Sequence, residues 1–421
     1  MRTLKTGAII GAASAALVLV LLAAGLTPLI DTAASKLAGI PADGRPVPSP
    51  AWLTMLIFAF AMGWTTVDCT RPAARLLLVI ASVVLLCSWT FVLSLYGKFF
   101  PPTLPVLGTV LSFALGSFWI NTRIGSRKQT LERLFGQRLP QTSLDTIIDS
   151  PTPAEFPGKV VNASVLVVSV QNHAELMELL PPESYTAITN LFLRTASDYL
   201  VESGGYLDEC NGECIRVVFG APLPDERHSI RACRAAIDLA ARIDELNKEC
   251  DAKWQRRLDV RMAIDSGDII AGVFGGARLG SYSVAGPAVD FARRLCGSCS
   301  VYGSRILIGP DTYTPAAESI EVRPIEILKV AARRRRVEIY EILSARHGLS
   351  PERERSRDHF WTGVLHFRDR QWDKAVDEFT KARIPGIPDE ALDFYLRRIE
   401  ESRRQRTPLY LEAVPALFHV A

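Results

Sequence analysis

The chain has 421 residues, which is enough for two or three domains. Its formal net charge is only +3, which argues against a nucleic-acid partner, and we expect none. Apolar residues make up 48% of the sequence and gather before about residue 120, a pattern typical of a membrane region followed by soluble domains.

The N-terminal region, residues 1–122, contains four apolar stretches without a charged residue, and we expect an α-helical membrane region there. The predicted spans are residues 6–30, 52–67, 76–96 and 104–120. The second stretch is close to the lower length limit for a span. A cleaved signal peptide is the alternative for the first stretch, but its apolar run is longer than the core of a signal peptide.

Basic residues flank these stretches on one side of the predicted membrane. They are Arg2, Lys5, Arg71, Arg75, Arg123, Arg127 and Lys128. By the positive-inside rule the segments that carry them are cytoplasmic, and residues 31–50 lie outside. We therefore expect a multi-pass protein of the inner (plasma) membrane, embedded in the lipid bilayer, with cytoplasmic N- and C-termini. The outer loop is too short for a folded sensor.

Residues 123–158 predict a juxtamembrane coupling helix followed by a linker. Leu131, Leu134, Phe135 and Leu139 recur at three- and four-residue steps, as on one face of a helix. The end of the segment is rich in Pro and polar residues, which is typical of a linker. The alternative is a basic helix held at anionic headgroups, and both roles can hold together.

The stretch GGYLDECNGECIRVVFG, residues 204–220, predicts a β-hairpin. Its expected strands are 206–210 and 214–219. Asn211-Gly212 between them favours a type I′ turn, which needs positive φ at both positions.

The segments around this hairpin predict an α+β domain over residues 159–345. The β-branched run SVLVVSV at 164–170 is typical of a strand buried on both faces. Helical and strand patterns follow at 182–201, 228–250, 258–264 and 269–274. The resulting order, β-α-β-β-α-β, is that of a ferredoxin-like core.

The hairpin and three later motifs resemble, in the same order, those of class III nucleotidyl cyclases, the adenylate/guanylate cyclase family. The later motifs are AIDSGDIIAG at 263–272, YSVAGPAVDFARRL at 282–295 and LKVAARRRRVEIYEIL at 328–343. The resemblance spans about residues 131–343 and implies a class III cyclase domain. One anchor helix followed by three closely spaced spans is also similar to the CHASE2-type membrane-bound cyclase arrangement, without its large extracellular sensor.

The resemblance implies a metal site of two carboxylates that hold two divalent ions, Mg or Mn, on a nucleoside triphosphate. Ser169 and Glu213 stand at the two metal positions. The neutral hydroxyl of Ser169 is a poor ligand for Mg²⁺, whereas Glu213 could still bind a metal. His173 stands where the family has Phe, and we interpret it as a helix-start residue rather than a ligand.

The nucleotide-reading and catalytic positions implied by the resemblance are also changed. Glu209 replaces a Lys and offers only acceptors to the base, and Pro287 replaces an acceptor side chain. Arg294 matches the arginine that stabilises the transition state, whereas Asp290 replaces its partner Asn. The alternative for Arg294 is an ion pair with Asp290, four residues earlier on the same helix.

Two further patterns have both a functional and a structural interpretation. Cys296 and Cys299, with Cys210 and Cys214, could suggest zinc, but no His stands at ligand spacing, so we favour reduced thiols without disulfides. The glycine-rich loop 275–280 could hold a phosphate through its backbone N–H groups, and a plain hairpin loop is the alternative.

Residues 359–401 predict a helical hairpin, followed by a tail at 402–421. Its small and aromatic residues have tetratricopeptide-like (TPR-like) spacing: Gly363, Ala375, Phe379 and Ala382. A single unit of this kind cannot bury its own face, so we expect it to pack on the cyclase-like domain or on a partner. Peptide binding is the alternative.

Together these features favour a membrane-anchored, cyclase-like signalling protein. The substitutions predict a pseudo-cyclase with a regulatory or scaffolding role, as a homodimer or as a heterodimer with another cyclase-family chain. One alternative is an active, atypical adenylate cyclase that converts ATP to cyclic AMP. The other is a nucleotide sensor that binds ATP or GTP without turnover. Mg or Mn is expected only if a nucleotide binds.

Overall fold

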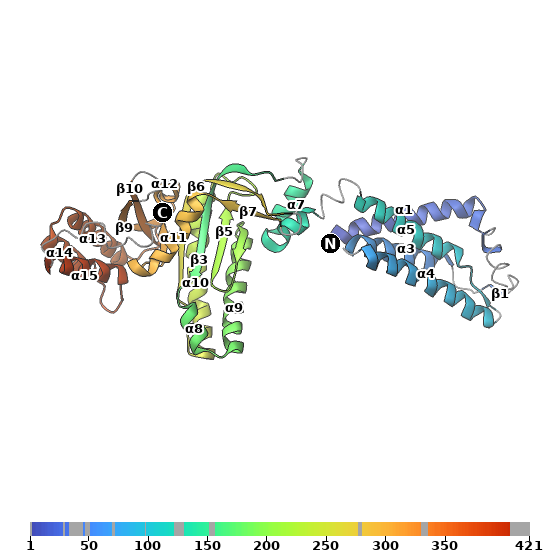
Figure 1. Cartoon of the computed structure of the whole chain (residues 1–421), viewed down its shortest axis with the longest axis horizontal. Coiled ribbons are helices and arrows are strands. Elements are labelled where there is room, and N and C mark those ends of the chain that lie inside the picture. The colour runs from blue at the N-terminus through green and yellow to red at the C-terminus, as the bar shows by residue number, and fades with distance from the viewer. Residues whose placement is uncertain are drawn as a thin grey trace. The chain divides into compact units, whose positions relative to one another are not determined.

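The computed structural model describes most of the chain, which forms two compact units, Met1–Thr130 and Leu131–Ala421 (Figure 1). The described residues are 2–27, 30–32, 45–46, 51–69, 72–96, 98–121, 130–150, 156–276, 280–329 and 336–404. Some predictions fall outside them: Arg71, Arg123, Arg127, Lys128, most of the 31–50 loop, residues 151–155 of the linker, residues 277–279 of the glycine-rich loop and most of the 402–421 tail.

The described part of the first unit contains four long apolar helices. They are α1 (Arg2–Ala23), α3 (Ala51–Asp68), α4 (Pro72–Leu95) and α5 (Thr103–Asn121). Segments of three of them are long and apolar enough to cross a membrane: Leu4–Ala23, Ala73–Leu93 and Thr103–Ile120. The apolar part of α3, Trp52–Asp68, is shorter, so the structure gives three candidate spans where the sequence predicts four. The first helix also ends at Ala23, before the predicted end of its span.

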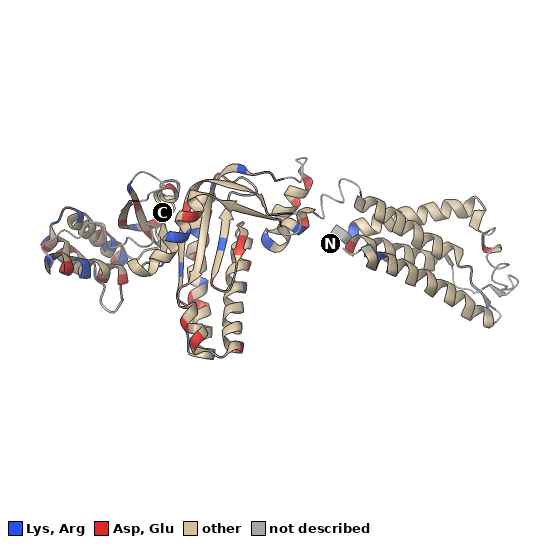
Figure 2. Ribbon diagram, viewed as in Figure 1, with Lys and Arg blue, Asp and Glu red and all other residues tan. Residues whose placement is uncertain are grey.

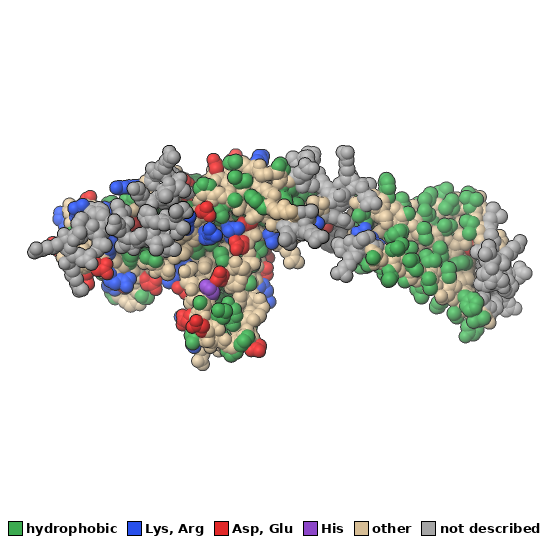
Figure 3. All heavy atoms as spheres, in the orientation of Figure 1, with side chains coloured by type: hydrophobic (Ala, Val, Ile, Leu, Met, Phe, Trp, Pro, Cys, Tyr) green, Lys and Arg blue, Asp and Glu red, His purple; other side chains and the backbone are tan. Residues whose placement is uncertain are grey.

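Small residues allow α3 to pack closely against both α1 and α5. A Cβ on Gly7 of α1 would lie 2.6 Å from Trp64 Cα, and a Cβ on Gly116 of α5 would lie 2.8 Å from Thr66 Cγ2. Such contacts are typical of helices that associate in a membrane. Charged residues are scarce on these helices (Figure 2), and apolar side chains cover their visible surface (Figure 3). A short parallel pair, β1 (Arg45–Pro46) and β2 (Lys98–Phe99), joins two loops.

A mixed β-sheet forms the centre of the second unit. Its strand order is β4-β5-β3-β6-β8-β10-β9, and β7 pairs with β6. The strands are β3 (Lys159–Val170), β4 (Tyr206–Cys210), β5 (Cys214–Phe219), β6 (Val260–Phe274), β7 (Ser281–Ala285), β8 (Ile306–Ile308), β9 (Ile320–Lys329) and β10 (Arg336–Ala345). Strand β3 lies between β5 and β6, and its residues 163–168 are all buried, as the β-branched run predicts.

Helices cover both faces of this sheet. They are α7 (Gln141–Asp149), α8 (His173–Leu179), α9 (Pro182–Glu202), α10 (His228–Trp254), α11 (Pro287–Tyr302) and α12 (Pro310–Ala316). One core contains Phe192 of α9 together with Leu166 of β3, and the other contains Leu295 of α11 together with Val165. The order β3-α9-β4-β5-α10-β6 is the β-α-β-β-α-β order that the sequence predicts.

The predicted hairpin forms with the predicted strand bounds, but its turn differs from the prediction. Gly205 is required because a Cβ there would lie 2.2 Å from a side-chain atom of β5. The type I′ prediction is wrong, since neither Asn211 nor Gly212 has a positive φ. Instead, the Asn211 side-chain oxygen accepts from the backbone N–H groups of Glu213 at 3.1 Å and Cys214 at 2.8 Å. These two hydrogen bonds to the Asn211 side chain take the place of the backbone hydrogen bond that closes an ordinary β-turn.

The coupling segment is attached to the hairpin by aromatic side chains. The ring centroid of Phe135 lies 5.9 Å from that of Tyr206 and 5.1 Å from that of Tyr282. In the adjacent 3-10 turn η1 (Gly136–Arg138), Arg138 donates to a backbone oxygen of β4 at 3.3 Å. Buried ring contacts of this kind fix their partners, so the end of the coupling segment and β4 are held together.

The C-terminal part, as far as residue 404, contains three helices, α13 (Pro351–Arg368), α14 (Trp372–Ala382) and α15 (Glu390–Arg404). The sequence predicts two helical patterns in this part, beginning at 359. The first helix begins earlier because the Ser350 hydroxyl caps it, accepting from the Arg353 N–H, and because Pro351 suits the first turn. Gly363 of α13 lies against Phe379 of α14, where a Cβ would be 2.7 Å from the ring.

A buried ion cluster attaches this helical part to the sheet. Arg323 of β9 donates to Glu341 of β10 at 2.7 Å and to both carboxylate oxygens of Asp389 at 2.6 and 2.9 Å. The Arg323 guanidinium also lies 4.4 Å from the ring centroid of Phe360 in α13. The helices therefore pack on the domain of the same chain, one of the two arrangements that we expect from the sequence. These contacts do not establish a TPR-like unit.

A second buried polar cluster links β3, β6 and α10. The Ser164 hydroxyl lies 2.7 Å from His228 Nδ1 and 2.6 Å from the Ser266 hydroxyl. His228 Nε2 lies 3.0 Å from the Asn162 side-chain oxygen. Both ring nitrogens of His228 therefore have a polar partner inside the domain.

We predict that Arg323→Leu lowers the free energy of unfolding by about 3–5 kcal/mol, because it leaves two buried carboxylates without their partner. Chemical denaturation of the detergent-solubilised chain measures this change. The matched control is Arg383→Leu, whose exposed pair with Asp393 contributes at most about 0.5 kcal/mol. Equal effects of the two substitutions would contradict the role of the cluster.

We also predict that stability falls as the pH drops through the ordinary His228 pKa of 6.5. Burial lowers the pKa of His228, and Asp225 offsets part of this effect. The unfolded chain therefore binds the proton more readily than the folded chain, so acid favours unfolding. Between about pH 7.5 and about pH 5.5, the free energy of unfolding from chemical denaturation should change less for His228→Gln than for the unaltered chain. If the free energy of unfolding of the two proteins changes equally with pH, His228 is not the group responsible.

Candidate functional site

The positions that the sequence assigns to metal binding lie side by side at one end of β3. Ser169 pairs in register with Cys214 of β5 on one side and with Arg261 of β6 on the other. The backbone N–H of Val170 donates to the carbonyl oxygen of Glu213 at 2.9 Å. Strand pairing therefore brings Ser169 next to Glu213, although 43 residues separate them in the sequence.

Glu213 already has a partner in this chain. Its Oε2 atom lies 2.6 Å from Nε2 of His173, the first residue of α8. The other ring nitrogen, Nδ1, lies 3.2 Å from the carbonyl oxygen of Val170. The side chains of His173 and Glu213 are 37% and 52% exposed. His173 begins a helix, as predicted, but the sequence analysis missed its contact with Glu213, which depends on where β3 ends relative to the hairpin.

Glu209, at the nucleotide-reading position, is paired as well. Arg216 of β5 is its register partner, and Arg216 Nη1 lies 2.8 Å from Glu209 Oε2. Arg216 Nε also donates to Asp208 at 2.6 Å. The side chain of Asp208 is fully buried, and its Oδ1 atom has no hydrogen-bond partner among the described residues. Sequence reasoning missed Arg216, although an Arg on the strand opposite two acidic residues is a usable signal.

The remaining site residues lie on α11. Pro287 occupies the first turn of this helix, after Gly286, whose φ of +142° favours glycine. Asp290 pairs with Arg293 at 3.5 Å, so the ion pair considered between Asp290 and Arg294 is not the one formed. Within the described residues, no ion pair or hydrogen bond connects the side chains of Pro287, Asp290 and Arg294 to the hairpin residues.

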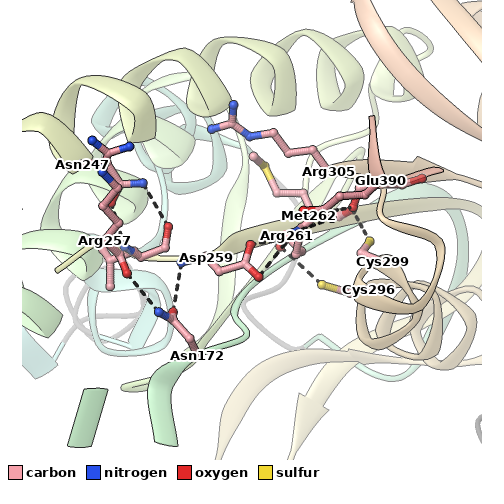
Figure 4. A network of polar contacts seen from close by, with 12 residues as sticks. Asn172, Asn247, Arg257, Asp259, Arg261, Met262, Cys296, Cys299, Arg305 and Glu390 are labelled. Atoms are coloured by element: carbon pink, nitrogen blue, oxygen red, sulfur yellow. Dashed lines mark hydrogen bonds and ion pairs between the residues drawn. The ribbon is translucent and has the colours of Figure 1, made fainter. Parts of the chain in front are cut away.

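A chain of polar contacts links the C-terminal helices to the start of α8 (Figure 4). Glu390 of α15 lies 3.3 Å from Arg261 Nη2, and Arg261 Nε donates to Asp259 at 2.6 Å. The backbone N–H of Asp259 donates to the Asn172 side chain at 2.9 Å. Because Arg261 pairs with Ser169, this network ends beside the metal position.

The cysteine pairs have structural surroundings. Cys296 and Cys299 are buried on α11, and their thiols contact the carbonyl oxygens of Arg261 at 3.5 Å and Met262 at 3.3 Å (Figure 4). Burial raises the pKa of Cys214 to about 12, which keeps its thiol protonated. No group of three or more His, Cys, Asp or Glu residues in the described part of the chain could hold a metal ion, so the zinc interpretation has no support.

Comparison with known proteins identifies the family of residues 158–344, which lie within the second unit. Residues 158–344 match the family model of the adenylate and guanylate cyclase catalytic domain. Adenylate cyclase 1 of Rhizobium meliloti is 23% identical over 180 residues, which cover 43% of this chain and 27% of that protein. The adenylate cyclase of Anabaena cylindrica is 25% identical over 186 residues, covering 42% of this chain and 36% of that protein. The chain thus matches only about a quarter to a third of the length of these relatives.

Two solved structures are similar to part of this chain. The adenylyl cyclase CyaB from P. aeruginosa is 26% identical with a TM-score of 0.42, and the match covers 46% of this chain and all of that one. The guanylyl cyclase Cya2 is 22% identical with the same TM-score, covering 46% of this chain and 98% of that one. On the family match and the sequence relatives, residues 158–344 belong to the class III adenylate/guanylate cyclase family.

Proposed function

We propose that this chain is a membrane-anchored signalling protein whose cyclase-family domain regulates or scaffolds and does not turn over nucleotide. The observation that carries the proposal is the state of the two charged hairpin positions. Glu213 pairs with His173 at 2.6 Å, and Glu209 pairs with Arg216 at 2.8 Å. Groups that would have to contact metal and base are therefore already in contact with neighbours in the same chain.

The metal chemistry of the family does not fit the residues present. Class III cyclases use Mg or Mn, and two such ions need a set of anionic oxygen ligands. Ser169 offers a neutral hydroxyl, and Glu213, the carboxylate at the second metal position, is in contact with His173. The two-ion arrangement therefore lacks its ligands on this side of the site.

The catalytic helix is also electrostatically unfavourable. Asp290, in place of a neutral side chain, adds a negative charge one helical turn from Arg294. A developing pentavalent phosphate is itself negative, so a carboxylate here opposes the stabilisation that Arg294 would supply. Removal of one well-placed donor already costs about a hundredfold to a thousandfold in rate. Together, the replacements at the metal, base and catalytic positions account for a site without turnover.

A nucleotide sensor is the second candidate, and Glu209 is the observation that favours it. A carboxylate accepts hydrogen bonds and donates none. Guanine presents two N–H donors on the edge where adenine presents a ring nitrogen acceptor, so Glu209 suits GTP better than ATP. Binding would require Glu209 to exchange its contact with Arg216 for contacts with the base.

The membrane and assembly proposals rest on separate observations. The three candidate spans and the central packing of the shorter helix α3 support a four-helix anchor. The basic flanking residues support an inner-membrane protein with both termini in the cytoplasm. Among the described residues of one chain, no ion pair or hydrogen bond joins the α11 residues to the hairpin residues, which supports a dimer, either of two copies or with another cyclase-family chain. The CHASE2-type arrangement stays an expectation from the sequence.

We predict that the unaltered full-length chain forms no cyclic nucleotide from ATP or GTP with Mn²⁺. The matched variant restores the family residues through Ser169→Asp, Glu209→Lys, Glu213→Asp, Pro287→Asp and Asp290→Asn. It also carries Arg216→Met together with Asp208→Asn, because Arg216 would repel the introduced lysine and its loss alone would leave the buried Asp208 unpaired. Product from the variant alone supports the proposal, and ordinary turnover by the unaltered chain overturns it. Measurement of GTP and ATP binding to the unaltered chain separates a sensor from a scaffold.

We also predict that Arg216→Met lowers the free energy of unfolding by about 3 kcal/mol, because it leaves the buried carboxylate of Asp208 unpaired. Adding Asp208→Asn should restore most of this loss in chemical denaturation. The control Glu209→Gln changes a half-exposed partner of Arg216 and should cost at most about 0.5 kcal/mol. If the control is as harmful as Arg216→Met, Arg216 does not act through Asp208.

A further inference from the structure

A cavity of about 320 Å³ lies where the C-terminal helices meet the cyclase-family domain. Residues of β6, β9 and β10 line it from the domain, and the start of α13 and the loop between α14 and α15 line it from the helices. Figure 4 shows three of the lining residues, Arg261, Arg305 and Glu390. The family match ends at residue 344, and no metal, nucleotide-reading or catalytic position lines the cavity. It is therefore separate from the candidate site.

Positive charge exceeds negative charge on the lining of this cavity. Five arginines line it, against three carboxylates. Arg323 contacts two of these carboxylates, Glu341 at 2.7 Å and Asp389 at 2.6 Å. Arg261 contacts the third, Glu390, at 3.3 Å. The lining therefore keeps an excess of positive charge after its own ion pairs have formed.

Arg353 is the arginine of this cavity that a ligand can use. Arg305 contacts Asp244 at 2.8 Å, and Arg357 contacts Asp358 at 2.7 Å, so both already have a carboxylate from outside the lining. The guanidinium of Arg353, in the first turn of α13, makes no ion pair or hydrogen bond with the residues that the structure describes. A guanidinium presents a planar fork of N–H donors that matches a carboxylate.

Apolar side chains form much of the remaining lining. They are Leu343, Leu349, Ala382, Ile384, Ile387 and Pro388. Ile387 is 43% exposed, so it leaves apolar surface that a bound molecule would cover. The volume is at the lower end of the range of about 300–1,000 Å³ for small-molecule sites. The cavity therefore suits a small molecule with one anionic group and an apolar body.

We propose that this cavity binds a medium-chain aliphatic carboxylate, with its carboxylate on Arg353 and its chain against Ile384 and Ile387. A single negative charge fits better than a phosphate, because three carboxylates share the same lining and would repel a second charge. Such a ligand would contact both the domain and the helices and so strengthen their attachment. The site goes beyond the proposed function, since it involves neither nucleotide nor metal.

The test is equilibrium binding of radiolabelled octanoate to the detergent-solubilised full-length chain, with empty micelles as the blank. We expect one bound octanoate per chain. Affinity should rise about fourfold for each methylene group from butanoate to octanoate, because each added group buries more apolar surface. Unlabelled 1-octanol, which has the same chain without the charge, should displace octanoate at least about tenfold less effectively.

Three variants of the chain locate the bound acid. Arg353→Gln should weaken octanoate binding at least about tenfold, and Ile387→Ser at least about threefold. Both side chains are exposed, so the fold does not depend on them. The matched control is Arg355→Gln on the same helix, because Arg355 is exposed and does not line the cavity. This control should bind octanoate like the unaltered chain.

Three results would overturn the proposal. The first is no octanoate bound above the micelle blank. The second is displacement by 1-octanol as effective as displacement by unlabelled octanoate, which would show an apolar site without a role for the charge. The third is an equal effect of Arg353→Gln and Arg355→Gln, which would place the acid elsewhere on the chain.

Discussion

The pairing of β3 with β5 and β6 places every hairpin residue of the candidate site. In this register Ser169 lies between Cys214 and Arg261, and the carbonyl oxygen of Glu213 accepts a hydrogen bond from the Val170 N–H at the end of β3. A slip of one residue would turn each side chain to the opposite face of the sheet. The buried run in the middle of β3 prevents such a slip, because its side chains fill the cores on both faces.

On this scaffold the electrostatics differ from what nucleotide cyclisation requires. Arg216 is shared between a buried carboxylate, Asp208, and the more exposed Glu209, while His173 contacts Glu213. Pairs of this kind stabilise the free chain and compete with any ligand for the same groups. Under the proposed function, packing holds the fold together while the charged side chains at the site pair with one another. A regulatory role needs the folded surface and not the reaction.

The C-terminal helices are also attached to the cyclase domain by ion pairs. Arg323 binds Glu341 within the sheet and Asp389 outside it, so the helices are attached through a charge that the domain already buries. Glu390 reaches Arg261, the register neighbour of Ser169. At the other end of the domain, Phe135 fixes the coupling segment to β4. The coupling segment therefore contacts β4, which carries Glu209, and the C-terminal helices contact Arg261, the register neighbour of Ser169.

The elements and their order could be predicted from the sequence because local patterns specify them. The hairpin strands and the buried run of β3 have the predicted positions, since alternation and β-branching are visible in the sequence itself. The pairs of Glu209 with Arg216 and of Glu213 with His173 could not, because they depend on strand register and on the first turn of α8. The partner of Asp290 was also misassigned, since Arg293 and Arg294 both lie within reach along a helix.

The central claim is that the cyclase-family domain of this chain is chemically silent. Mass spectrometry can count the cyclic nucleotide that the purified chain forms from GTP or ATP with Mn²⁺ during a long incubation. The decisive comparison is with Arg294→Ala, which removes the one retained catalytic group and leaves the hairpin pairs intact. The account predicts that both proteins give the same background. Cyclic product that is present with the unaltered chain and absent with Arg294→Ala would contradict it.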